Sequence, residues 1–487
     1  MTRIIAGYII LILSVAWPSH ALLHANPVSQ AGHRNDEPAI DMPAIAGPEV
    51  LIDSIILEGN RLTRDRIIMR ELLFDPGTRM SPDELIRNIR KSRSNLMNTG
   101  LFNFVDIHVD QTRHPSVAIT FSFIERWNIW PIPVFELDEP NVNQWLRDPS
   151  LSTINYGINL FMANITGRNE RIWLSAKTGN EQSINIALRT PYFDRAQSLR
   201  WGIYYGMNRS KRRAYNTQDN QRLFVRSDRF ISNEYTVSTN MSYRREYYNQ
   251  HTVSLGFHYH DYADTLLVLN PRFGPEGERR FSFLSFSYHF RRDVRDMAVY
   301  PLDGYLVEGG ITRKGLRTLP GEIMDVTTLR GAIRYYTPLA HRWYTAWSIN
   351  GKWSEGTTLS YFDQRGLGFS GSLVRGYENH VVDGHKYLII KSNIKYNLLP
   401  EQVSELGFIP SKKFNRIHYA LYLNLFVDAG IINDRHFAHN NQLANKWLAG
   451  TGLGLDFHTY YDTVLRAELT MNRHGKGGVY FHVMAPI

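Results

Sequence analysis

From about residue 150 to the end of the chain, apolar and polar residues alternate along segments of roughly ten residues, which turn residues separate. In residues 235–243, Tyr235, Val237 and Met241 fall on one face of an extended strand, while serine, threonine and asparagine fall on the other. Alternation at this length, with many aromatic residues, is typical of strands that cross a membrane between lipid and a polar interior. Strands of soluble sandwiches are nearer five or six residues long.

About sixteen segments carry this pattern, and an even number suits a bacterial barrel whose two ends lie on the same side. The expected strands lie near residues 152–164, 169–179, 181–190, 198–208, 220–230, 232–246, 248–262, 279–292, 303–314, 324–337, 341–352, 386–398, 415–429, 448–458, 462–472 and 477–487. The sequence therefore predicts an all-β, transmembrane, sixteen-stranded antiparallel β-barrel.

Residues 50–126 follow a different pattern, which predicts a small α/β domain with the element order β-α-α-β-β. A strand is expected at 50–58, and two more between residues 104 and 125. Ser81 followed three residues later by Glu84 fits a capping box at the start of a helix.

The first residues predict export. Arg3 precedes an apolar run from Ile4 to Trp17, and small residues follow. This is the three-part pattern of a secretory signal peptide, which we expect to cover residues 1–25. The run is shorter than the roughly 20 residues that a membrane-spanning helix needs. Residues 26–48 are expected to form a flexible leader.

Composition narrows the function classes. The chain of 487 residues contains no cysteine, which excludes disulfides, thiolate metal sites and thiol nucleophiles. Its net charge of +9 is compatible with binding to nucleic acid, and equally with binding to anionic lipid or lipopolysaccharide. His258 and His260 share a strand face, and two lumen-facing histidines explain them better than a metal site. The sequence contains no phosphate-binding loop and no catalytic triad, so we expect neither an enzyme nor a cofactor or metal requirement.

The connection at residues 353–385 is unusually long for a loop without a function, and it contains S-G-S-L-V-R-G-Y-E-N-H at 370–380. It follows the eleventh expected strand and therefore begins on the extracellular side. An arginine inside a barrel is costly unless a carboxylate pairs with its planar fork. Strand alternation points Asp428 and Asp456 toward the lumen.

Four motifs together resemble the BamA/TamA superfamily of outer-membrane insertases and two-partner-secretion transporters. In chain order they are Arg292-Asp293 with Pro301 and Gly304, Val374-Arg375-Gly376-Tyr377, Phe426-Val427-Asp428-Ala429-Gly430, and Gly452-x-Gly454-Leu455-Asp456-Phe457. The resemblance covers residues 50–487. It implies a periplasmic POTRA domain at 49–127 and a barrel at 128–487 in the outer membrane of a Gram-negative-type bacterium.

In that family a long loop is held inside the barrel. The resemblance assigns this role to the motif Val374, Arg375, Gly376 and Tyr377. Arg375 would reach Asp428 in the lumen, where Asp456 would be a further carboxylate partner. Gly376 would let the chain fold back tightly, and Tyr377 would pack against the barrel wall.

Two edges are expected to be available for pairing. Pro486 lacks an N–H in the last expected strand, and Gly157 weakens the first, so we predict a weak seam that opens sideways. An ordinary frayed terminus would carry the same residues.

In the POTRA domain, the edge of the strand containing Phe104, Val105, Ile107 and Val109 is expected to receive a strand from an unfolded client.

These features predict a protein that assembles or inserts client polypeptides into the outer membrane without ATP. The expected partners are unfolded outer-membrane or secreted clients, outer-membrane lipid and lipopolysaccharide, and periplasmic or lipoprotein accessory factors, with no nucleic acid. Two alternatives stay open: a secretion transporter that passes a dedicated partner through the lumen, and a passive solute pore.

Overall fold

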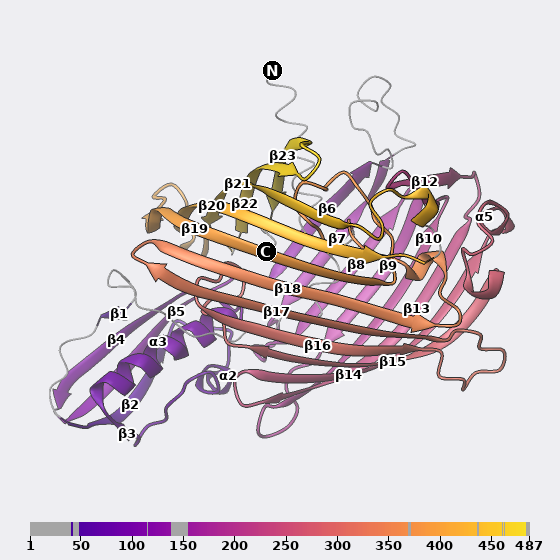
Figure 1. The fold of residues 1–487 in the computed structure, drawn as a ribbon. Coiled ribbons are helices and arrows are strands. Elements are labelled where there is room, and N and C mark those ends of the chain that lie inside the picture. Colours follow the sequence, from indigo (N-terminus) through magenta and orange to yellow (C-terminus); the bar gives the residue numbers. More distant parts are fainter. Residues whose placement is uncertain are drawn as a thin grey trace.

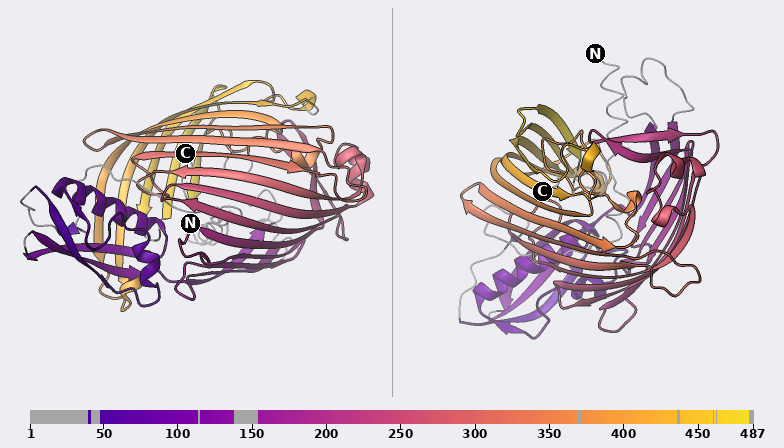
Figure 2. Two further views of the ribbon diagram at one scale, coloured as in Figure 1. Left: turned by 90° about the horizontal axis from the view of Figure 1, so that it is seen from below. Right: turned by 45° about the vertical axis from the view of Figure 1, so that its right-hand side comes forward.

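The computed structural model describes residues 40–41, 48–113, 115–137, 154–368, 372–435, 438–459, 461 and 463–483. The expected signal peptide, nearly all of the expected leader, and Pro486 lie outside these residues. Within them, a small α/β domain lies beside one end of a large curved sheet (Figures 1 and 2).

The small domain contains a five-stranded sheet in the order β1-β4-β5-β2-β3. Its elements are β1 (Ile40–Asp41), β2 (Val50–Glu58), α2 (Asp65–Met69), β3 (Arg79–Met80), α3 (Pro82–Asn98), β4 (Phe102–Arg113) and β5 (Ser116–Glu125). Ser81 caps α3, because its hydroxyl accepts a hydrogen bond from the Glu84 N–H at 3.3 Å. The predicted β-α-α-β-β order is present, with the short strands β1 and β3 added at the sheet edges.

The core of the small domain forms between the helices and the sheet. Leu85 and Ile89 lie on the buried face of α3. They belong to the same hydrophobic cluster as Val105, Ile107 and Val109 of β4, which are at most 2 % exposed. These three β4 side chains therefore stabilise the domain itself, and only the backbone of the strand is directed toward the sheet edge.

The edge of β4 that the sequence predicted to be free is occupied in the structure. Ile107 and His108 pair in parallel with Ile40 and Asp41 of β1. At the other end of the strand, Phe104 is 7 % exposed, because the Arg416 guanidinium lies 4.2 Å from its ring centre and His418 packs against it. A further strand could pair with β4 at Ile107 and His108 only after β1 separates.

The large sheet has sixteen strands, each antiparallel to its neighbours, and the predicted fold class and strand number are confirmed. The first eight are β6 (Ile129–Leu137), β7 (Ile154–Ala163), β8 (Arg171–Thr178), β9 (Glu181–Arg189), β10 (Leu199–Ser210), β13 (Ser232–Arg245), β14 (Asn249–Tyr262) and β15 (Arg280–Asp293). The last eight are β16 (Gly304–Lys314), β17 (Val326–Ala340), β18 (Trp343–Gly356), β19 (Lys386–Glu405), β20 (Arg416–Asn433), β21 (Trp447–Thr459), β22 (Thr463–Asn472) and β23 (Gly477–Val483).

Two of the predicted strands were wrong, but the errors offset each other in the number of barrel strands. The segment expected as the first strand, 152–164, is the second strand β7, and the true first strand β6 was missed. Pro131 and Pro133 make β6 difficult to recognise as a strand from the sequence, because proline is rare inside strands. The segment expected at 220–230 is not in the barrel: it belongs to a separate hairpin of β11 (Arg212–Gln218) and β12 (Gln221–Arg226).

The strands present an apolar face outward and a polar face inward. In β20, Leu425 and Val427 are 50 % and 56 % exposed, whereas Asn424 and Asp428, which flank them in the sequence, are completely buried. This inside-outside alternation is the pattern of a barrel that lies in lipid and holds a polar interior. Among the described helices, none is both long and apolar enough to cross a membrane.

The hairpin β11–β12 lies at the end of the barrel opposite the small domain, near α5 (Asp264–Leu269) (Figure 1). Its turn inserts between two loops. The Asn220 N–H donates to Asn441 Oδ1 at 2.9 Å, and its carbonyl accepts from the Val381 N–H at 2.8 Å. The hairpin therefore joins the loop after β18 to the loop after β20. The remaining short helices are η2 (Pro275–Gly277), η3 (Tyr361–Asp363), α6 (Lys412–Asn415) and η4 (Ala438–Asn440).

Ion pairs, the first buried and the second partly exposed, hold the small domain against the barrel. Arg244 of β13 donates from Nη1 and Nη2 to the two carboxylate oxygens of Glu71, at 2.8 and 2.9 Å. Burial raises the pKa of Glu71, but the Arg244 guanidinium outweighs burial and holds that pKa below its ordinary value. Arg416 and Asp106 form a second pair at 2.7 Å. Both pairs join residues far apart in the sequence.

The turn after β15 makes a further contact. The Asn98 side chain donates to the backbone carbonyl of Asp296 at 3.2 Å. The Asp296 carboxyl itself accepts from the N–H groups of Met297 and Leu302. Burial raises the pKa of Asp296 to about 7, so this group changes charge near neutral pH.

The sheet has two unpaired edges, β6 and β23, since no register joins these strands within the described residues. Gly157 is not at this seam as predicted, because it lies in β7 and pairs on both sides. The register between β6 and β7 runs without a break past Pro131 and Pro133. Their ring nitrogens therefore face the free edge, which lacks two N–H donors.

Candidate functional site in the barrel lumen

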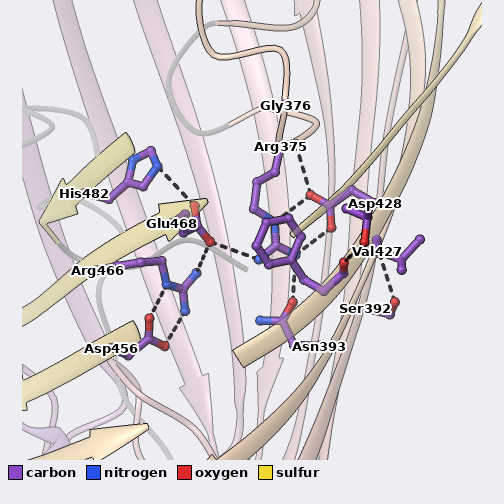
Figure 3. Close-up of polar contacts among 12 residues, drawn as sticks. Arg375, Gly376, Ser392, Asn393, Val427, Asp428, Asp456, Arg466, Glu468 and His482 are labelled. Carbon is purple, nitrogen blue, oxygen red and sulfur yellow. Dashed lines mark hydrogen bonds and ion pairs between the residues drawn. The ribbon is translucent and has the colours of Figure 1, made fainter. Parts of the chain in front are cut away.

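Arg375 lies at the centre of a buried polar cluster inside the barrel (Figure 3). Its Nε and Nη2 donate to the two carboxylate oxygens of Asp428 at 2.8 and 2.6 Å, and its backbone N–H donates to Oδ2 at 3.2 Å. Both side chains are at most 1 % exposed. The expected contact between Arg375 and Asp428 is present, in the bidentate form that is strongest for arginine and carboxylate.

Three further residues satisfy the Arg375 guanidinium. Nη2 donates to Asn393 Oδ1 at 2.7 Å, and Nη1 lies 3.3 Å from Glu468 Oε1. The guanidinium carbon lies 3.7 Å from the centre of the Phe426 ring, a cation–π contact. A buried charge is tolerated only with such complete pairing. Strand alternation points Asn393 and Glu468 inward, but it does not reveal which inward residues lie opposite the loop.

The other motif residues pack the loop against the barrel wall. Val374 and Tyr377 are at most 2 % exposed and belong to one hydrophobic cluster with residues of β19 and β20. Gly376 has a φ of +93°, which favours glycine, and its carbonyl accepts from the Asn472 side chain at 3.0 Å. Gly450 of β21 leaves room for the loop, because a Cβ there would overlap the Arg375 carbonyl.

Asp456 is not a partner of Arg375, contrary to the expectation that it would pair with the loop. It forms a bidentate pair with Arg466, with the Nη2–Oδ2 bond at 2.6 Å. The Tyr300 hydroxyl donates to the same carboxylate at 2.7 Å. Asp456 and Arg466 stand directly opposite each other in β21 and β22, and cross-strand pairing of opposite charges was the signal that could have revealed them.

Glu468 connects the loop to the last strand. Its Oε1 lies 3.3 Å from Arg375 and 3.5 Å from Arg466, and its Oε2 lies 3.2 Å from His482 Nε2 in β23 (Figure 3). Asn379 lies two residues after the loop motif. Its side chain donates to the Tyr480 hydroxyl of β23 at 3.2 Å. The arrangement is a network of ion pairs and hydrogen bonds that fixes a loop to strands β20, β22 and β23.

Comparisons with known proteins agree with this architecture. Residues 164–459 match the Omp85 superfamily domain, and residues 50–126 match the POTRA family, described as a surface antigen variable number repeat. None of the curated proteins matches the sequence significantly.

Two solved structures match over most of the chain. BamA from Haemophilus ducreyi lacking POTRA domains 1–3 is 15 % identical, with a TM-score of 0.47 over 89 % of this chain and 84 % of that one. CdiB from Escherichia coli is 14 % identical, with a TM-score of 0.50 over 90 % of this chain and 76 % of that one. Since the superfamily match covers more than half of the chain, this protein belongs to the Omp85 superfamily, as an outer-membrane barrel with a POTRA domain ahead of it.

Proposed function

We propose that this protein assembles client polypeptides into the outer membrane by offering the unpaired edges of β6 and β23 to client strands. The observation that carries this proposal is the absence of any register between β6 and β23 among the described residues. An unpaired strand edge is a template for another extended chain. Assembly of this kind needs no ATP, because pairing of the client backbone and burial of its apolar face in lipid supply the free energy.

The buried loop favours a route at the seam over a route through the lumen. Passage through the lumen would displace the loop and break the pair between Arg375 and Asp428, both at most 1 % exposed. Removal of one partner from a buried pair costs about 3–5 kcal/mol, because the other charge is left unpaired. Opening between β6 and β23 breaks no pairing between described residues. This difference favours assembly over a secretion transporter or a passive pore.

We further propose that the POTRA domain receives clients in the periplasm before they reach the seam. Its β4 edge is paired with Ile40 and Asp41 at one end, and the Phe104 side chain packs against Arg416 at the other. Reception therefore requires one of these contacts to release. Outer-membrane lipid and lipopolysaccharide would contact the apolar outer face, and accessory factors would bind on the periplasmic side.

Site-specific photo-cross-linking in cells tests where clients pass. A photoreactive residue replaces Phe481 of β23, which is 75 % exposed at the seam. The matched control replaces Ile333 of β17, which is 53 % exposed but far from both edge strands in the sheet order. A third position, Asn240, lies on the polar, inward face of β13. We expect client cross-links at Phe481 alone; cross-links at Asn240 alone would support secretion, and none at any position would support the pore.

A covalent lock tests whether the seam must open. Because the natural chain has no cysteine, a bismaleimide can join one cysteine in β6 to one in β23 without background. The control joins Leu469→Cys to Val479→Cys, which are already direct partners across β22 and β23. We expect the seam lock to block client assembly and the control lock to leave it intact. Normal assembly with a locked seam would refute the proposal.

A further inference from the structure

Three side chains meet at the border between the loop and the last two strands. Glu378 follows the loop motif, Glu468 belongs to β22, and His482 belongs to β23. One nitrogen or oxygen atom from each lies within 4.8 Å of the atoms from the other two. The three elements they come from are the ones that the Arg375 cluster holds together.

Both carboxylate oxygens of Glu378 accept from the Gly376 N–H, at 3.0 and 2.9 Å, whereas two atoms of the other side chains lack such partners. Glu468 is 1 % exposed, and its Oε1 is engaged by the guanidinium groups of Arg375 and Arg466. Its Oε2 and His482 Nε2 are both buried and 3.2 Å apart, and neither makes a hydrogen bond of acceptable geometry. With the proton of neutral histidine on Nδ1, Nε2 is an electron-pair donor, as is a carboxylate oxygen. When these two donors face each other in a buried site, a cation bound between them offsets their repulsion.

We propose that Glu378, Glu468 and His482 form a binding site for a divalent transition-metal ion such as Zn²⁺. Zinc lies about 2.0–2.2 Å from imidazole nitrogen and carboxylate oxygen, so tetrahedral ligand atoms are separated by roughly 3.4 Å. The three ligand atoms lie within 4.8 Å of one another, so they must move closer together to bind an ion. Solvent would fill the fourth position, as it does in zinc sites with three protein ligands.

The surroundings of the three side chains suit such an ion. The two guanidinium groups on Glu468 Oε1 fix its carboxylate, as hydrogen-bonding partners commonly fix metal-ligating carboxylates. An imidazole ligand favours zinc and its neighbours over Mg²⁺ and Ca²⁺, which prefer oxygen. A bound ion would add a second tie between the loop and β23, beside the bond from Asn379 to Tyr480. Its effect on the seam rests on the proposed function, whereas the binding site does not.

Calorimetric titration of the full chain tests the site. The protein is purified in detergent, stripped with a chelator and titrated with Zn²⁺ alone. We expect one zinc ion per chain, at least tenfold weaker binding in His482→Ala and in Glu378→Gln, and no competition from Mg²⁺. The matched control is His474→Ala, an exposed histidine in the turn before β23, which should bind zinc as the natural chain does.

Each outcome is decisive. Absence of zinc binding in the natural chain, or equal loss in His474→Ala and His482→Ala, would overturn the site. Heat-induced mobility shifts on gels show whether each variant barrel is folded, and Glu378→Gln provides a second test if His482→Ala is not. Zinc binding as expected without client cross-links at Phe481 would leave the metal site standing and remove the proposed function. Client cross-links at Phe481 without zinc binding would support the proposed function and remove the metal site.

Discussion

Replacing Arg375 by methionine tests whether the loop is held in the lumen by its pair with Asp428. The substitution removes the hydrogen bonds to Asp428, of 2.8 and 2.6 Å, together with those to Asn393 and Glu468. It leaves the completely buried Asp428 carboxylate without its charge partner. Loss of one partner from a buried pair costs about 3–5 kcal/mol. We expect the free energy of unfolding to fall by that amount. Methionine retains much of the apolar stem, so lost packing contributes little.

Urea unfolding in detergent, followed by tryptophan fluorescence, measures the change. The matched control is Arg435→Met, because Arg435 pairs with Glu355 at the surface, where the two side chains are 52 % and 49 % exposed. Exposed pairs contribute at most about 1 kcal/mol. Trypsin digestion reports on the loop itself, and we expect faster cleavage between residues 353 and 385 only in the Arg375 variant.

A double-mutant cycle isolates the pair from its surroundings. Asp428→Asn alone leaves the guanidinium buried without its main partner, so we expect a loss similar to that of Arg375→Met. In the double variant neither charge remains, and the combined loss should fall short of the sum by at least about 1.5 kcal/mol. If Arg375→Met behaves like Arg435→Met, or if the two losses simply add, the pair does not hold the loop.

Three other substitutions test the loop and the domain junction. Gly450→Ala places a methyl group on the carbonyl of the loop arginine and should expose the loop to trypsin, whereas Gly407→Ala, which meets no atom within 4 Å, should not. Glu71→Gln should loosen the POTRA domain, measured as faster hydrogen exchange in α2 and α3. In the natural chain the pKa of Glu71 is lowered, so its pairing with Arg244 is intact at neutral pH and is lost as pH falls through the folded-state pKa. Asp296 depends on pH in the opposite sense, because its pKa is raised to about 7. The turn that contains it is most stable when the Asp296 carboxyl is protonated, and it becomes less stable as pH rises through 7. Asp296→Asn should remove that dependence from hydrogen exchange in the turn.

The sequence predicted the barrel well because inside-outside alternation is a local property. It failed at β6, where Pro131 and Pro133 interrupt the ordinary composition of a strand while leaving its pairing with β7 intact. It failed again at β12, because a hairpin half-exposed to water alternates in the same way as a strand exposed to lipid. Both errors arose where local pattern does not report on the partner of a strand.

The site was predictable only in part for the same reason. The resemblance to a known family assigned Arg375 and Asp428 to each other, and the structure brings them together. The contacts of Glu468 with the loop and with His482 depend on the stagger of β22 and β23 relative to the loop, which a single sequence does not contain. Coverage of the β4 edge by Ile40 likewise depends on a segment more than sixty residues away.

The two edges of the seam differ in a way that predicts which of them pairs better with a client. Every residue of β23 carries an N–H, whereas the free edge of β6 lacks donors at Pro131 and Pro133. The loop also ties β23 to the lumen through Asn379 and Tyr480. A client strand would therefore form more hydrogen bonds with a better-held partner at β23 than at β6.

Photo-cross-linking from Phe481 of β23 and Phe135 of β6 compares the two edges directly. Both side chains face outward, with 75 % and 51 % of their surface exposed. We expect the client yield at Phe481 to be several-fold higher. In Pro131→Ala with Pro133→Ala, which restores both donors, the yield at Phe135 should rise toward that at Phe481. A higher yield at Phe135 in the natural chain would show that N–H donors do not decide where the client pairs.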